Sequence, residues 1–185
     1  MGRAITLPTP GDPVTNDAYG VTLNDAVNQM NNDFLAARRS ADSAAINSTT
    51  LANESALLLP VAASAAYLVE WWLRLDSPAA SDFKYSWTGP ASATFVWSSL
   101  GALITTTVND PAAFPDVVRN TDGPLIGTVI QHGTIAVSTF QTIRGQGYLE
   151  TSGTAGNLQM QVAQVVAGAS LIIRKGSWLK AQRVA

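Results

Sequence analysis

The alternation of apolar and polar positions after residue 66 is the strongest structural signal in the chain. Tyr67, Val69 and Trp71 alternate with Leu68 and Glu70, and the alternation continues to residue 75. A period of two places successive side chains on opposite faces of a β-strand. The further strand candidates are residues 83–87, 93–98, 103–108, 125–135, 140–143, 157–166, 170–175 and 178–184.

Turn-forming residues separate these candidate strands. Glycine, proline, asparagine and aspartate concentrate at residues 88–90, 109–111, 122–124, 145–147 and 152–156. About eight to ten short strands at this spacing, with no helical stretch between them, are typical of an antiparallel sandwich or jelly roll. The fold class we predict is therefore mainly β. Residues 157–166 carry no charge on either face, so we expect strands such as this one to be buried on both sides.

A different period precedes the β region and predicts a helix over residues 22–39. Thr22 with Asp25 three residues later resembles a capping box. Apolar residues then recur at spacings of four, three, four and three: Leu23, Val27, Met30, Phe34 and Ala37. This narrow seam is typical of packing against identical helices, as a short trimerisation coiled coil. The alternative is an amphipathic helix docked on its own domain.

Three segments follow from these patterns. Residues 1–21 are an extended anchoring arm, residues 22–65 are the helical segment with an Ala/Ser/Thr-rich connector, and residues 66–185 are a β knob. Prolines fix φ and remove backbone donors, so the arm is expected to become ordered on a partner; a floppy terminus is the alternative. The arm residues that we single out are Ile5, Leu7, Pro8, Pro10 and Pro13.

Composition restricts the function classes. Of the 185 residues 46% are hydrophobic and 13% charged, the net charge is −2, and there is no cysteine. A typical domain is about 25% charged. Disorder needs high charge with low hydrophobicity, nucleic-acid binding needs a basic field, and a disulfide scaffold needs cysteine. We expect none of these, nor a membrane span or an export signal. The shortage of charge indicates a subunit interface.

The sequence shows no catalytic signature. His132 is the single histidine, so a histidine-rich metal site is not available, and we expect His132 to be structural. The acidic residues are scattered, mostly at expected turns, and do not form the paired carboxylates of a glycosidase. We therefore expect no enzyme activity, no metal and no cofactor. The tryptophans are expected in the core or at an interface, although they could also stack on sugars. The knob residues that we select are Trp71, Trp72, Trp87, Trp97, Leu158 and Trp178.

Several separated motifs resemble a C-terminal module of virion proteins from tailed phages of actinobacteria. A Tyr-x-Val-x-x-x-Leu strand at residues 67–73 precedes a block matched by Asp82, Lys84, Trp87, Gly89 and Pro90, followed by Ala93 and Trp97. The closing motifs are matched by Gly153, Gly156, Leu158, Ala163 and Gln164, then by Gly176, Ser177, Trp178, Leu179 and Arg183. The resemblance covers about residues 66 to 185. The arm is similar, more weakly, to the start of phage minor tail and fibre proteins.

This resemblance implies a tumour-necrosis-factor-like jelly roll that assembles as a trimer on a fibre tip or capsid. The function we expect is that of a structural virion protein: a homotrimeric head fibre, capsid decoration or minor tail protein. Its arm would bind phage capsid or tail proteins, and its knob would project from the particle. The alternative is a lectin-like tip that recognises host cell-wall glycans. A depolymerase is the third class, and it would need an acidic pair that the sequence does not show.

Overall fold

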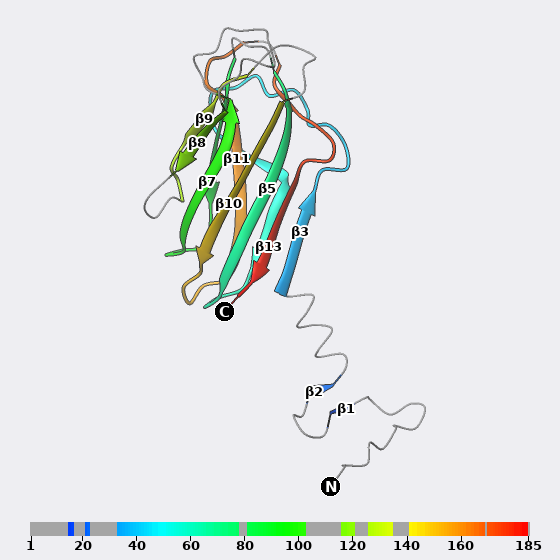
Figure 1. The fold of residues 1–185 in the computed structure, drawn as a ribbon, viewed down its shortest axis with the longest axis vertical. Helices are drawn as coiled ribbons and strands as arrows, with labels where there is room; N and C mark the ends of the chain where they lie inside the picture. The colour runs from blue at the N-terminus through cyan, green and yellow to red at the C-terminus, as the bar shows by residue number, and fades with distance from the viewer. Residues whose placement is uncertain are drawn as a thin grey trace, which may run out of the picture.

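The structure is a computed structural model of the whole chain. It describes side chains for residues 33–77, 81–102, 126–134, 141–168 and 170–184, and the backbone of three further short strands. The described chain is mainly β, with antiparallel sheets in a sandwich-like arrangement (Figure 1), which confirms the predicted class. None of the described residues forms a helix long and apolar enough to cross a membrane.

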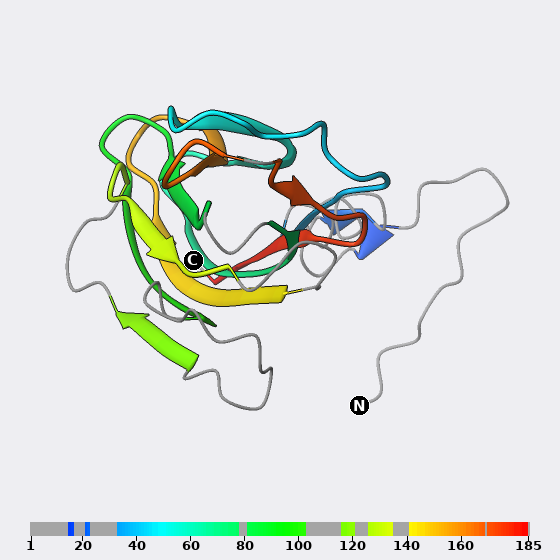
Figure 2. The same ribbon diagram turned by 90° about the horizontal axis from the view of Figure 1, so that it is seen from above.

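Two sheets make up the body. The large sheet contains, in spatial order, β3 (Phe34–Arg38), β13 (Trp178–Arg183), β5 (Ala66–Asp76), β10 (Gln141–Glu150), β7 (Thr94–Ala102) and β8 (Asp116–Asn120), with β12 (Ile172–Ile173) beside β5. The small sheet contains β4 (Ala52–Val61), β11 (Gly156–Gln164), β6 (Phe83–Thr88) and β9 (Ile130–His132). A separate pair is formed by β1 (Thr15–Asn16) and β2 (Val21–Thr22). Seen from above, the strands of the body form curved layers around a common interior (Figure 2).

The strand order, which the sequence left open, is nested. Strands of the first half pair with those of the second half in reverse order: β3 with β13, β4 with β11, β5 with β10, β6 with β9, and β7 with β8. Every one of these pairs is antiparallel. The chain therefore follows the path of one long hairpin that is folded over between two sheets. Strands remote in sequence become neighbours, and β13, close to the C-terminus, lies between β3 and β5.

An aromatic cluster fills the interior. The alternation predicted for residues 67–75 is confirmed, since Trp71 and its inward neighbours in β5 are buried while Leu68, Glu70 and Trp72 face outward. The Trp71 ring meets the Trp87 ring edge-on at 5.1 Å and the Trp97 ring at 5.7 Å. Edge-to-face pairs of this kind stabilise beyond their buried area. The core thus joins the two sheets through large rings.

Strand β10 differs from the prediction at its centre. Residues 145–147 were expected to form a turn, but they continue the strand between β5 and β7. Gly145 is required there because a Cβ atom would lie 2.1 Å from the ring of Trp71. The glycine that signals a turn in the sequence instead makes room for an aromatic ring against the strand.

The uncharged strand β11 is buried on both faces, as predicted. It lies between β4 and β6, and a register shift between Gln159 and Gln161 places Leu158, Gln159 and Met160 all in buried positions. The amide of Gln159 donates a hydrogen bond of 2.7 Å to the carbonyl oxygen of Glu54. A buried polar side chain is tolerated when it is hydrogen-bonded in this way.

The predicted helix is wrong from Phe34 onward. Phe34–Arg38 form strand β3, which pairs with β13 at the edge of the large sheet. Leu35 and Ala37 pack toward the core, whereas Phe34 lies on the outer face. Pairing with the open edge of β13 overrides the local preference for a helix. Three positions of the predicted seam, Leu23, Val27 and Met30, lie outside the described residues, as do the selected arm residues Ile5, Leu7, Pro8, Pro10 and Pro13.

The predicted connector is also wrong in part. Residues 52–61 form β4, an edge strand of the small sheet that carries the buried core residues Leu57 and Leu59. Residues 40–51 link the two edge strands, and Ile46 forms an isolated bridge with Leu171. The β body therefore includes residues before position 66.

Candidate binding face on the large sheet

The outer face of the large sheet combines exposed apolar and cationic side chains in ordered rows. Figure 1 views the sheet from this side, with β7, β10, β5, β13 and β3 across the front. The paired registers align outward residues of five strands at the same level. Adjacent strands of a sheet lie about 5 Å apart, so outward residues that are paired across strands are neighbours. The register therefore defines two rows of side chains on this face.

The first row, which we call the apolar row, lies near the start of β5. Leu68 pairs with Tyr148, and Tyr148 pairs with Val96. On the other side Gln182 pairs with both Leu68 and Phe34. The four large side chains are 40–55% exposed. Exposed apolar groups that are contiguous across a sheet mark interaction surfaces more often than single ones do.

The second row, which we call the Arg-Trp ladder, lies four residues further along β5. It runs from Arg38 to Trp178, then to Trp72 and Arg144, through three successive cross-strand pairs. Trp72 is 46% exposed, and both arginines are exposed. Among the described residues neither Arg38 nor Arg144 makes an ion pair.

Between the two rows lies a third level of outward-facing residues, in which the charges of Glu70 and Lys180 cancel each other. Lys180 forms an ion pair with Glu70 at 2.8 Å and also lies 5.4 Å from the centre of the Trp178 ring. The pair is about half exposed, so it stabilises the fold by at most about 1 kcal/mol. Its effect on the face is to cancel the acidic charge beside the ladder.

A hollow of about 480 Å³ opens on the ladder. Trp72, Trp178 and Arg144 line it, together with the polar side chains of Ser98 and Gln146. Gly145 contributes to the lining with its backbone. The hollow is therefore part aromatic and part polar, as small-ligand sites generally are.

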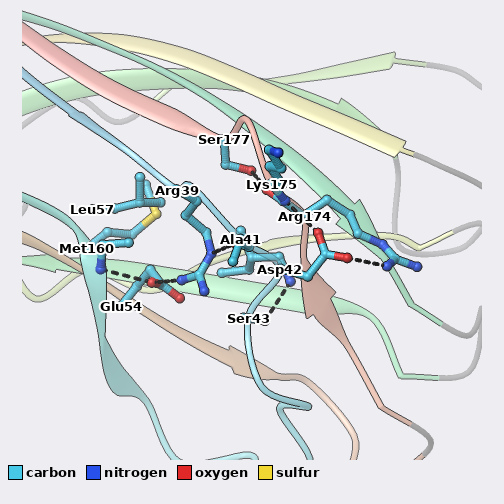
Figure 3. Close-up of polar contacts among 12 residues, drawn as sticks. Arg39, Ala41, Asp42, Ser43, Glu54, Leu57, Met160, Arg174, Lys175 and Ser177 are labelled. Atoms are coloured by element: carbon cyan, nitrogen blue, oxygen red, sulfur yellow. Dashed lines mark hydrogen bonds and ion pairs between the residues drawn. The ribbon is translucent and has the colours of Figure 1, made fainter.

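A polar cluster fixes the edge of the sheet that carries Arg38. The guanidinium of Arg39 forms a largely buried ion pair with Glu54, which ties the end of β3 to β4 in the other sheet (Figure 3). The backbone N–H of Arg39 donates to Ser177 at 2.9 Å, and Gly176 N–H donates to Arg39 at 3.0 Å. These contacts hold β3 against β13, so the first residue of the ladder is positioned by contacts across both sheets.

Arg174 joins two aspartates in the same cluster. It forms ion pairs with Asp42, at 2.7 Å, and with Asp76 (Figure 3 draws the Asp42 pair). The backbone N–H of Lys175 donates to Asp42 at 2.7 Å. This hydrogen bond, followed by the one from Arg174, lowers the pKa of Asp42, because both favour the charged carboxylate.

The single histidine lies in the interior. His132 is fully buried, its Nε2 atom lies 2.9 Å from the hydroxyl oxygen of Ser99, and its ring stacks on Tyr85. Burial raises the pKa of Tyr85. Ser99 is itself only 2% exposed, so this polar pair is packed within the core.

The structure divides the selected tryptophans into two groups. Trp71, Trp87 and Trp97 are buried, as is Leu158, whereas Trp72 and Trp178 lie on the outer face. The arginines of the ladder and the residues Val96 and Tyr148 were not selected from the sequence. Alternation within each strand marks them as outward-facing, but only the register between strands brings them together.

Comparisons with known proteins leave the family open. No family model and no curated protein matches the chain. Among solved structures, the chain is similar to a structure of infectious bursal disease virus, Gt strain, with 11% identity, 82% of this chain and 38% of that chain covered, and a TM-score of 0.20. The VP2 subviral particle of the same virus gives 8% identity, 82% and 37% coverage, and a TM-score of 0.20. The chain thus spans less than two fifths of these chains, and similarity at this level carries no argument about function.

Proposed function

We propose that this protein is a structural subunit of a tailed-bacteriophage particle, a homotrimeric fibre or spike. In this proposal the knob is displayed on the virion as a head fibre, capsid decoration or minor tail protein. The arm, with Ile5, Leu7, Pro8, Pro10 and Pro13, binds capsid or tail proteins of the phage. The motifs that resemble those of actinobacteriophage virion proteins support this role, and the nested strand pairing supports a jelly roll.

The observation that carries the proposal is the apolar row. Phe34, Leu68, Tyr148 and Val96 align across the outer face of the large sheet. A single sandwich would normally present polar side chains on that face. Burying each of these half-exposed side chains stabilises an interface by about 1 kcal/mol, so identical rows meeting around one axis favour self-association.

Substitution within the row tests the interface. We expect Val96→Lys to shift the sedimenting species from trimer to monomer, because three buried ammonium groups would each have to be desolvated. Val166→Lys is the matched control, since Val166 is 57% exposed and lies after the end of β11 in the other sheet. An unchanged trimer in Val96→Lys, or equal loss in both variants, would contradict the assigned interface.

Deletion of residues 1–21 tests the anchoring role. The proposal predicts that the truncated protein still folds but is no longer incorporated into particles, because the arm makes the contact with the capsid or tail. Circular dichroism checks the fold, and immunoblotting of purified virions measures incorporation. Normal incorporation of the truncated chain would refute the anchoring role.

A further inference from the structure

We propose that the Arg-Trp ladder binds an acidic glycan, a sugar chain that bears uronic-acid carboxylates. The ladder consists of Arg38, Trp178, Trp72 and Arg144 on four adjacent strands. Its three strand spacings give a length of about 14 Å. This inference names a ligand class for the knob of the proposed virion protein, and it rests on that function only for the source of the glycan.

The two ends of the ladder provide positive charge that no ion pair with a described residue neutralises. Arg38 and Arg144 are exposed and make no ion pair with any described residue. The nearest acidic level is already paired, since Lys180 binds Glu70 at 2.8 Å. A planar guanidinium donates two parallel hydrogen bonds to a carboxylate. The ladder is therefore a local cationic site on a chain with a net charge of −2.

The centre of the ladder provides two neighbouring indole side chains. Trp178 and Trp72 are direct cross-strand neighbours, and Trp72 is 46% exposed. An indole placed half in solvent combines an apolar ring with a polar tip, which is a frequent arrangement at binding surfaces. The C–H face of a pyranose ring can pack on such a surface while its hydroxyl groups remain free to form hydrogen bonds.

The hollow beside the tryptophans provides those hydrogen-bonding groups. Its lining includes Ser98, Gln146 and Glu70, from three adjacent strands. Hydroxyl, amide and carboxylate groups together can donate and accept, as the hydroxyls of a sugar require. A purely hydrophobic partner would leave these groups unpaired, so the lining favours a glycan over an apolar protein surface.

Single-stranded nucleic acid is the main rival, because aromatic side chains with cationic neighbours also bind bases and phosphates. Such binding tracks the backbone along an extended basic groove. On one side of the ladder the next level of the sheet is neutralised by the Glu70–Lys180 pair, and the apolar row follows it. On the other side Arg74 is exposed on β5, and its guanidinium donates a hydrogen bond of 3.0 Å to the carbonyl oxygen of Lys175. The cationic surface therefore comprises the ladder and Arg74 and ends at the neutralised level, which favours a ligand with few charges.

The ladder and the apolar row are separate sites on one face. They lie four residues apart along β5, a separation of about 13 Å. A contact between copies at the row therefore leaves room for a ligand at the ladder. Binding and self-association can be measured independently, so failure of one proposal is distinguishable from failure of the other.

Calorimetric titration of the full chain with a short uronic-acid oligomer tests the proposal. We expect binding that is weakened about tenfold by Arg144→Ala, since a lost charge-assisted hydrogen bond of at least 1.4 kcal/mol corresponds to that factor. Trp72→Ala is expected to abolish detectable binding, and Trp72→Phe to retain part of it. Val166→Ala, at an exposed position beyond the end of β11 in the other sheet, is the control and should bind as the unchanged protein does.

Three probes decide the outcome. The neutral hexose oligomer of the same length should bind at least about tenfold more weakly than the acidic one; equal binding would overturn the requirement for acidic groups. Tighter binding of a single-stranded oligonucleotide, lost in Trp72→Ala, would overturn the glycan assignment. Absence of acidic-glycan binding both in the unchanged protein and in a monomeric Val96→Lys variant would overturn the proposal, whatever the oligomeric state.

Discussion

At the scale of single residues, the core depends on the fit between large rings and small neighbours. Trp71 contacts four other aromatic rings, including those of Trp87 and Trp97. Its indole lies against the backbone of Gly145, where a Cβ atom would come within 2.1 Å. One hydrogen in place of a methyl group at this position is therefore a condition for the packing of the whole cluster.

Substitution of Gly145 by alanine is the direct test of this packing. We expect Gly145→Ala to lower the free energy of unfolding by about 1–3 kcal/mol, the usual cost of overpacking a core, or more if the ring has no alternative position. Gly153→Ala is the control, because nothing lies within 4 Å of an added Cβ atom there. Urea denaturation measures both. Equal stability of the two variants would contradict the described packing.

A second residue-scale prediction concerns the pH dependence of stability. The pKa of Asp42 is lowered in the folded protein by the N–H of Lys175 and by Arg174. Its contribution is therefore present above the unfolded pKa of about 3.9 and is lost as the pH falls through the lower folded value. We expect Asp42→Asn to melt at a lower temperature than the unchanged protein at pH 7.

The difference between the two melting temperatures should narrow as the pH falls from about 4 through the lowered pKa of Asp42 in the folded protein, because below that pKa the carboxyl group is protonated in both the folded and the unfolded state. Asp82 is the control, because its ionisation has the opposite effect on stability. Burial raises the pKa of Asp82, so ionisation of this carboxyl group disfavours the folded state. Asp82→Asn should not show the same loss at neutral pH. A pH-independent difference for Asp42→Asn would contradict the assigned charge interaction.

At the scale of elements, the sequence predicts strands where each strand alternates by itself. Tyr67, Val69 and Trp71 mark β5 correctly because its two faces differ sharply. Strand β3 was expected as a helix because Phe34 and Ala37 also fit a helical spacing, and only β13, about 140 residues later, makes it a strand. Non-local pairing of this kind leaves no local signal.

The same limit applies to the candidate binding face. Trp72 and Trp178 were selected as interface or core residues, but their contact depends on the register between β5 and β13. The alternation within each strand indicates that Trp72 and Trp178 face outward, but it does not show that they are neighbours. The two arginines were not selected, since an isolated arginine on a strand is ordinarily a solvated surface residue.

The attachment of β3 to the body can be tested at its ion pair. The Arg39 and Glu54 side chains are 12% and 6% exposed, so removal of one partner leaves a nearly buried charge. We expect Arg39→Ala to destabilise the protein by about 3 kcal/mol. Lys180→Ala, which breaks the exposed pair with Glu70, should cost at most about 1 kcal/mol. Similar costs for the two variants would show that the Arg39 pair does not anchor β3.

At the scale of the whole molecule, the structure shows where uncharged parts of the chain lie. The uncharged strand β11 is buried within the small sheet, so part of the shortage of charge serves the core. On the outer face of the large sheet, the apolar row places large apolar side chains on four of five neighbouring strands. We interpret this row as the contact between identical subunits, which also leaves the ladder accessible above it.

The mass of the full chain in solution tests this central claim most directly. Light scattering at micromolar concentration should give three times the chain mass of 19.4 kDa, because the apolar rows are buried only in the assembled protein. A mass of 19.4 kDa at that concentration would contradict the account.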